Sequence, residues 1–315
     1  MDILAKPEYQ FLKQDSFFTN HPICYLTVAG SHAYGTNLGS SDIDIRGFYL
    51  DDINELLTFS SIREEYIDKD TDTVIFSFKK FIKLLLSCNP NMIELLGTNT
   101  ILFQNSIGKM IRDNSNLFLS KRAYNTFCGY AREQLNRLTS KNITTIDDEQ
   151  RIIYFRKHII DYVKFNFGDA IFLNFDDKNN ISCNVHIDNA DLKFIINCIT
   201  QLNDKIIGFN KLNHRNRKPD EAHLFKHAMH LIRLYLMGID ILESQQINTY
   251  RAKEHDLLMN IRLGRKTMQE IFDLQKELQV RIDNAYKISD LPDKPNVDKI
   301  NKLMLGIYFS ERKGE

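Results

Sequence analysis

The chain has 315 residues, 43% of them hydrophobic and 26% charged, which is enough for one large domain or two moderate ones with a sizeable core. Lys plus Arg and Asp plus Glu each number 41, so the chain is not a bulk polyanion binder, and any contact with nucleic acid must rest on a local patch. The five cysteines form no C-x-x-C pair, which argues against a zinc ribbon or redox motif and is typical of reduced thiols.

The N-terminal segment does not have the pattern of a signal peptide. Charged residues are scattered through the first twenty positions and interrupt any apolar region. No apolar run approaches the roughly 20 residues that are needed to span a bilayer. We therefore expect a cytoplasmic protein with no membrane partner.

The first part of the chain is predicted to alternate strands and short helices. Residues 23–31 are β-branched and apolar and end at Gly-Ser, which indicates a buried strand followed by a turn. A polar stretch over 32–41 predicts a loop or a short helical turn, and 42–50 returns as a strand. Residues 71–78 alternate and predict a third strand.

Helical spacing begins at residue 78 and continues to a stop near Asn89-Pro90, and a second helix follows over 92–96. Beyond about residue 105 the pattern is mostly that of amphipathic helices. These helices are predicted over residues 106–118, 120–140, 147–168, 190–207, 220–243 and 266–289. The exception is a β-hairpin over 171–187, whose role is open. The predicted class is α+β, with a catalytic domain over 1–105 and a mostly helical domain over 106–315 that forms the other wall of a cleft.

Two acids one residue apart lie inside the second predicted strand. Alternation along a strand places Asp42, Asp44 and Arg46 on one face and Ile43 and Ile45 on the other, where they anchor the strand in the core. Carboxylates so placed, about 7 Å apart along the strand, repel each other. A divalent cation removes this conflict, and Mg²⁺ prefers oxygen ligands that it shares between carboxylates and phosphates.

The Gly30-Ser31 turn has the chemistry of a phosphate site. A strand that ends at Gly-Ser presents backbone N–H groups and a hydroxyl, and the glycine permits a close backbone approach. A Gly-Ser turn alone is usually only a turn, and a lone D-x-D is often a pair of solvated charges. Their combination on adjacent predicted strands favours a site that holds a triphosphate and a metal.

The stretch GSHAYGTNLGSSDIDIRG, residues 30–47, resembles the signature of the polymerase-beta-type nucleotidyltransferase superfamily, in which a Gly-Ser turn precedes a D-x-D strand. The chain further resembles the bacterial and phage group of predicted nucleotidyltransferases called RNA-ligase-associated polymerases. FSFKKFIKLLLSCNPNMIELL (76–96) and KHAMHLIRLYLMGIDIL (226–242) also fit this group, so the resemblance spans nearly the whole chain.

The resemblance implies an enzyme that moves an NMP from an NTP, such as ATP, to an acceptor hydroxyl at a nucleic-acid end, most simply of RNA. It implies two Mg²⁺ ions, with Mn²⁺ as a substitute, held by Asp42, Asp44 and a third acid on a neighbouring strand. Asp72 is the best match for that acid and Asp70 is a weaker one. Asp72 as a simple strand cap is the alternative.

The resemblance also includes a polar stripe on the helix that is predicted over 220–243. Lys226, His230 and Arg233 follow i, i+4, i+7 spacing and share one face. These side chains are expected to bring cations to the triphosphate, together with Gly30 and Ser31. The alternatives are a solvated basic face or a histidine in the core.

Other readings remain open at this point. The acceptor can instead be a protein or small-molecule hydroxyl, and a nucleotide-binding or antitoxin-like module without turnover is the reading from another class. Arg46 is expected to pair with a neighbouring acid, and Glu94 to cap or brace the core. The sequence does not determine the preferred NTP or the oligomeric state.

Overall fold

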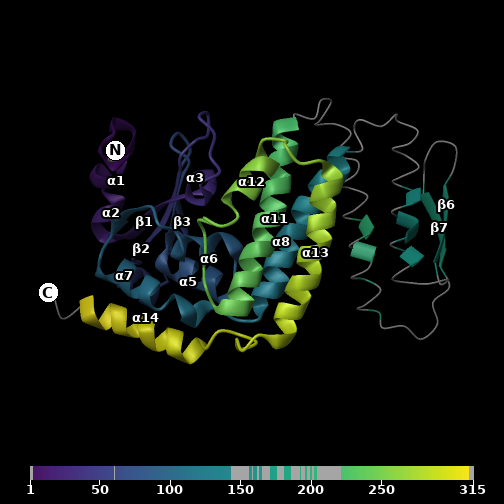
Figure 1. Ribbon diagram of the computed structural model, residues 1–315. Helices are drawn as coiled ribbons and strands as arrows, with labels where there is room; N and C mark the ends of the chain where they lie inside the picture. Colours follow the sequence, from purple (N-terminus) through teal and green to yellow (C-terminus); the bar gives the residue numbers. More distant parts are fainter. Residues whose placement is uncertain are drawn as a thin grey trace. The chain divides into compact units, whose positions relative to one another are not determined.

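The computed structural model describes residues 3–59, 61–142 and 221–311, and only short stretches between 143 and 220 (Figure 1). The chain divides into two compact units. One comprises Met1–Gln134 together with Ala228–Glu315, and the other Leu135–His227. Each is described by itself below.

The first unit is built on a five-stranded mixed sheet. Its strands are β1 (Ile23–Ala29), β2 (Asp44–Tyr49), β3 (Glu65–Asp68), β4 (Thr73–Ser77) and β5 (Ile101–Gln104). They lie in the order β3-β4-β2-β1-β5, and β2 and β4 are parallel while the other neighbours are antiparallel. The predicted α+β class is confirmed. The sequence predicts β1, β2 and β4, and misses the four-residue strands at the two edges.

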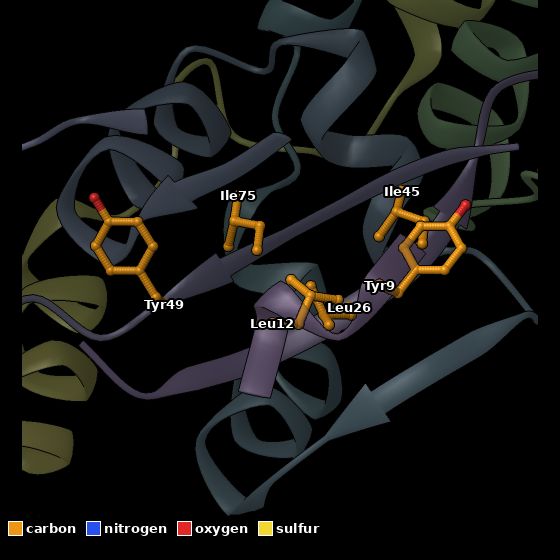
Figure 2. Packing of buried hydrophobic residues seen from close by; sticks show 6 residues of the cluster. All are labelled: Tyr9, Leu12, Leu26, Ile45, Tyr49 and Ile75. Carbon is orange, nitrogen blue, oxygen red and sulfur yellow. The ribbon is translucent and has the colours of Figure 1, made fainter. Parts of the chain in front are cut away.

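One face of the sheet is covered by the N-terminal segment. This segment forms the short helices η1 (Ile3–Ala5), η2 (Pro7–Tyr9), α1 (Phe11–Gln14) and α2 (Phe17–Asn20). Figure 2 shows the buried cluster that this segment forms with the sheet, which comprises Tyr9, Leu12, Leu26, Ile45, Tyr49 and Ile75. Full burial of such a side chain contributes about 1.5–3 kcal/mol. Ile45 is fully buried in this cluster and Ile43 packs against it, as predicted, so β2 is fixed by its apolar residues.

Helices follow the strands closely in the α/β part. They are α3 (Gly30–Tyr34), α4 (Ile53–Leu57), α5 (Phe78–Leu86), α6 (Pro90–Leu96), α7 (Ser106–Asp113), η3 (Ser115–Phe118) and α8 (Arg122–Asn142), whose last residues lie in the other unit. The Ser77 side chain caps α5 by accepting from Lys80 N, and Phe81 stacks on Phe48 of β2 with 4.7 Å between ring centroids. The Asn89 side chain caps α6, whose first residue is Pro90, so the predicted break between these helices is confirmed.

The C-terminal helices also belong to the first unit. They are α11 (Glu221–Ser244), whose first residues lie in the other unit, α12 (His255–Arg262), α13 (Met268–Ile288) and α14 (Val297–Glu311). In the first unit α8, α11 and α13 lie side by side (Figure 1), and the Tyr124 hydroxyl donates to Asp283 at 2.8 Å. Tyr308 of α14 donates to the buried Asp51 after β2, so the last helix returns to the sheet.

The grouping of helices with the sheet bears on the predicted division of the chain. Residues 106–134 and 228–315 group with the α/β part, because α7 packs on β1 and α14 packs on residues next to β2 and α5. The predicted folding domains, 1–105 and 106–315, stay a prediction.

The second unit contains the predicted hairpin. Strands β6 (Ile171–Phe175) and β7 (Ile181–Val185) pair antiparallel, with Ile171 opposite Val185. The helices predicted over 147–168 and 190–207 fall largely outside the described residues. None of the helices in the described part of the chain is both long and apolar enough to cross a bilayer. Cys24, Cys88 and Cys128 are buried thiols.

Candidate functional site

The Gly30-Ser31 turn lies directly against the second acid of the D-x-D motif. Strand β1 ends at Ala29, and α3 begins at Gly30, whose φ is +60°. A Cβ atom on Gly30 would lie 2.0 Å from Asp44 Oδ2. Both the left-handed backbone and the closeness of the carboxylate therefore require glycine here.

Gly30→Ala is expected to destabilise the protein by about 1–3 kcal/mol, because alanine is strained at this φ and its methyl group displaces the Asp44 carboxylate. Urea denaturation measures this change. Gly129→Ala is the control, because a Cβ there meets nothing within 4 Å and the residue lies inside α8. That change should stabilise the protein by about 0.5–1 kcal/mol. Equal stability of the Gly30→Ala and wild-type proteins would contradict the packing argument.

The parallel pairing of β2 and β4 brings Asp44 and Asp72 together. Ile45 pairs with Thr73, so the residues that precede them, Asp44 and Asp72, are also neighbours. The Asp72 side chain is 55% exposed. Its hydrogen bond with the Asp44 carboxyl, and then the charge and hydrogen bond of Arg46, hold the pKa of Asp72 below its usual range. Asp72 is thus kept ionised beside a second acid.

Arg46 supplies the positive charge at this pair. Its Nη2 atom lies 3.4 Å from Asp44 Oδ1 and 3.0 Å from Asp72 Oδ1. Its Nη1 atom donates to the backbone carbonyls of Ile45 and Asp72. The predicted pairing of Arg46 with a neighbouring acid is confirmed, and it also ties β2 to the start of β4.

The other two candidate acids are placed differently. Strand β2 begins at Asp44, so Asp42 lies in the loop before the strand. Alternation along the strand, from which Asp42 is predicted to share a face with Asp44, therefore does not apply to it. Asp70 lies in the turn between β3 and β4, and both Asp42 and Asp70 are exposed. Among the described residues, no three His, Cys, Asp or Glu side chains form a group that could hold a metal ion.

Asp44 and Asp72 nevertheless supply two carboxylate groups, which are suitable ligands for magnesium. Two adjacent carboxylates offer hard oxygen ligands, and Mg²⁺ or Mn²⁺ usually completes its shell with water and substrate phosphates. The space left by the missing Cβ of Gly30 is where Asp44 Oδ2 sits, next to the turn with phosphate-binding chemistry. The residues present therefore fit a divalent cation that is shared with a phosphate.

A pocket of about 260 Å³ adjoins this carboxylate pair. Its lining comes from β1, α3, β2, β4, α6, the loop after α6 and the residues after α11. The lining residues are Val28, Ala29, Gly30, Ala33, Tyr34, Asp44, Arg46, Phe76, Asn91, Met92, Glu94, Leu95, Thr98 and Thr249. The lining thus combines three charged side chains and a few polar groups with a largely apolar surface, as in many sites for organic substrates.

Beneath the pocket, Arg233 of α11 is buried in an ion pair. Its Nη1 atom lies 2.6 Å from Glu94 Oε1, and its guanidinium stacks over the Tyr34 ring at 3.7 Å. The Tyr34 hydroxyl donates to Glu94 Oε2 at 2.6 Å, and the Thr249 hydroxyl donates to the Glu94 carbonyl. Burial raises the pKa of Tyr34. Burial alone would lower the pKa of Arg233, but the Glu94 carboxylate more than reverses this effect.

The three residues of the predicted polar stripe on α11 therefore have different surroundings. The His230 ring is perpendicular to the Tyr34 ring, with 5.9 Å between centroids, and Arg233 covers a face of the same ring. Lys226 is exposed and belongs to the second unit. Glu94 braces the core, as the sequence predicts. Tyr34 and Thr249 were missed: Tyr34 lies inside the signature but has no spacing that marks it, and Thr249 has no sequence signal at all.

A mixed sheet with a Gly-Ser turn against a strand-borne aspartate defines the class of polymerase-beta-type nucleotidyltransferases. The model of the RNA repair pathway DNA polymerase beta family matches residues 8–165, about half of the chain, and the chain belongs to this family.

An uncharacterized protein of Methanocaldococcus jannaschii is 29% identical to the chain over 130 residues, which are 39% of the chain. The chain spans about half the length of that curated relative, 52%. No solved structure matches the chain.

Proposed function

We propose that the protein is a metal-dependent nucleotidyltransferase that moves an NMP from an NTP, such as ATP, to a hydroxyl at the end of an RNA. The observation that carries the proposal is the contact between Gly30 and Asp44, which joins the phosphate-binding turn to a carboxylate pair. The family supports the reaction class and a nucleic-acid acceptor. The buried thiols support a reducing, cytoplasmic setting.

Asp44 and Asp72 are proposed to hold Mg²⁺ or Mn²⁺, with Asp42 as a further ligand from the exposed loop before β2. When bound, such ions neutralise the charge on the phosphates and on the leaving pyrophosphate. Gly30 and Ser31 bind the triphosphate, and His230 adds a contact to the substrates. Arg233 is buried against Glu94 and Tyr34, so we propose that it supports the site through these residues.

In the proposed reaction, the acceptor oxygen bonds to the α-phosphorus as the bond to the β-phosphate oxygen breaks, and pyrophosphate leaves. Asp72 is exposed to an incoming acceptor, and it takes the proton of the acceptor hydroxyl. The site contributes chiefly by orienting the two substrates and stabilising charge.

The test is incubation of the protein with each α-labelled NTP, Mg²⁺ or Mn²⁺, and RNA, DNA or protein acceptors. Label transfer to an RNA end with release of pyrophosphate is the expected result. Transfer to a protein would change the acceptor, and nucleotide binding without pyrophosphate release under any condition would favour a non-catalytic module. Steep salt dependence of RNA binding would support phosphate contacts with the acceptor.

Ser31→Ala is expected to lower kcat/KM for the NTP about 10- to 150-fold, because one hydrogen bond to a charged group contributes about 1.5–3 kcal/mol. Steady-state pyrophosphate release measures the change. Ser40→Ala in the exposed loop after α3 is the matched control and should act like wild type. A covalent nucleotidyl adduct on Ser31 would contradict the binding role.

A further inference from the structure

The guanidinium of Arg46 occupies the oxygens that a metal would need. Its Nη2 atom contacts the Oδ1 atoms of both Asp44 and Asp72, at 3.4 and 3.0 Å. Asp44 Oδ2 is directed to the backbone of Gly30, so the Oδ1 side is the one shared with Asp72. One guanidinium nitrogen, Nη2, therefore serves as the common cationic partner of both carboxylates.

The rest of the guanidinium is anchored away from the carboxylates. Nη1 donates to the carbonyls of Ile45, at 2.9 Å, and Asp72. The Arg46 side chain is only 22% exposed and lines the pocket beside Asp44. A charge at this position is incompletely screened by water, so its repulsion of an arriving cation is substantial at these distances.

We propose that Arg46 is a built-in competitor of the divalent cation at Asp44 and Asp72. The inference rests on the proposed function and deepens it. A metal held by these two carboxylates would compete with Nη2 for the Oδ1 atoms. A guanidinium that loses carboxylate partners is well matched to phosphate oxygens, which a triphosphate on the adjacent Gly30-Ser31 turn provides.

The consequence is thermodynamic coupling between metal and nucleotide. Without nucleotide, the metal must displace Arg46, and its affinity is reduced. With nucleotide, Arg46 has a new acceptor, so each ligand tightens the binding of the other by the same factor. Arg46 thus limits the occupation of the site by metal alone.

The test compares Mn²⁺ binding by the wild-type, Arg46→Gln and Arg46→Lys proteins, measured by electron paramagnetic resonance with and without a non-hydrolysable ATP analogue. Arg46→Gln removes the charge but keeps an amide donor for the backbone carbonyls. It is expected to bind Mn²⁺ alone at least about tenfold tighter than wild type. The analogue should tighten Mn²⁺ binding less in Arg46→Gln than in wild type, and Arg46→Lys should resemble wild type. Equal or weaker Mn²⁺ binding by folded Arg46→Gln would overturn the proposal.

A measurement on the wild-type protein covers the case in which Arg46→Gln does not fold. The Arg46 side-chain ¹⁵N–¹H signal, assigned by its loss in Arg46→Lys, should shift as Mg²⁺ saturates the site, and an unchanged signal would overturn competition. Mn²⁺ binding by Asp44→Asn shows whether the proposed metal site exists at all, independently of any competition by Arg46. If wild type binds no Mn²⁺ that depends on Asp44, the proposed metal site is wrong, and competition falls with it.

Discussion

Asp44→Asn is expected to lower nucleotidyl transfer at least about 1,000-fold, a loss of about 4 kcal/mol of transition-state stabilisation, while the protein stays folded. Asparagine has the shape of aspartate, so it can keep the close contact with Gly30. It lacks the negative charge with which Asp44, together with Asp72, is proposed to bind the metal. The lost ion pair with Arg46 is long and partly exposed, and such pairs contribute about 0–1 kcal/mol to folding. Pyrophosphate release and the thermal unfolding midpoint measure the two effects.

Asp70→Asn is the matched control for this experiment. Asp70 is exposed in the turn between β3 and β4, two residues from Asp72, and it should tolerate the change with near-normal turnover. Asp72→Asn should lower turnover strongly. A folded Asp44→Asn protein with near-normal Mg²⁺-dependent activity would refute the assignment of Asp44. A strong loss of activity in Asp70→Asn with near-normal activity in Asp72→Asn would mean that Asp70, and not Asp72, is the third carboxylate.

The parts of the fold that the sequence predicts are those with a strong local pattern. The apolar run of β1 and the isoleucines of β2 mark buried strands, and the spacing of Phe78, Phe81 and Ile82 marks α5. The missed strands β3 and β5 are short sheet edges of four residues each. Their main support is pairing with β4 and β1, which is a contact between distant segments and leaves little trace in the local sequence.

For the candidate site too, the sequence predicts the residues with a local pattern and misses the contacts between distant segments. Gly30, Ser31 and Asp44 lie within a stretch of fifteen residues, so their combination is visible in the sequence. The partner of Arg233 is Glu94, which is 139 positions away. Helical spacing places Arg233 on a polar stripe with His230, but α11 is buried around most of its circumference from Ala228 onward, so the stripe cannot all face solvent. Which acid meets a buried arginine depends on how α6 and α11 pack.

Arg233→Ala is expected to destabilise the protein by about 3–5 kcal/mol, because it leaves the Glu94 carboxylate buried without its counter-charge. The two side chains are only 4% and 5% exposed, and the cation also covers the Tyr34 ring. Urea denaturation measures the loss. Arg281→Ala is the matched control: its ion pair with Glu243 is of similar length, 2.7 Å against 2.6 Å, but the two side chains are 53% and 33% exposed. That change should cost less than about 1 kcal/mol.

The same variant tests whether the ion pair supports the nucleotide site. Tyr34 is the last residue of the short helix that begins at Gly30, so loss of Arg233 should disturb the Gly30-Ser31 turn through Tyr34. At a temperature where Arg233→Ala is still folded, KM for the NTP should rise. Arg233→Lys should restore part of the stability, because it keeps the charge but not the planar group that stacks on the ring. Wild-type stability combined with a strong loss of turnover in Arg233→Ala would instead mean that Arg233 leaves Glu94 to contact the triphosphate directly.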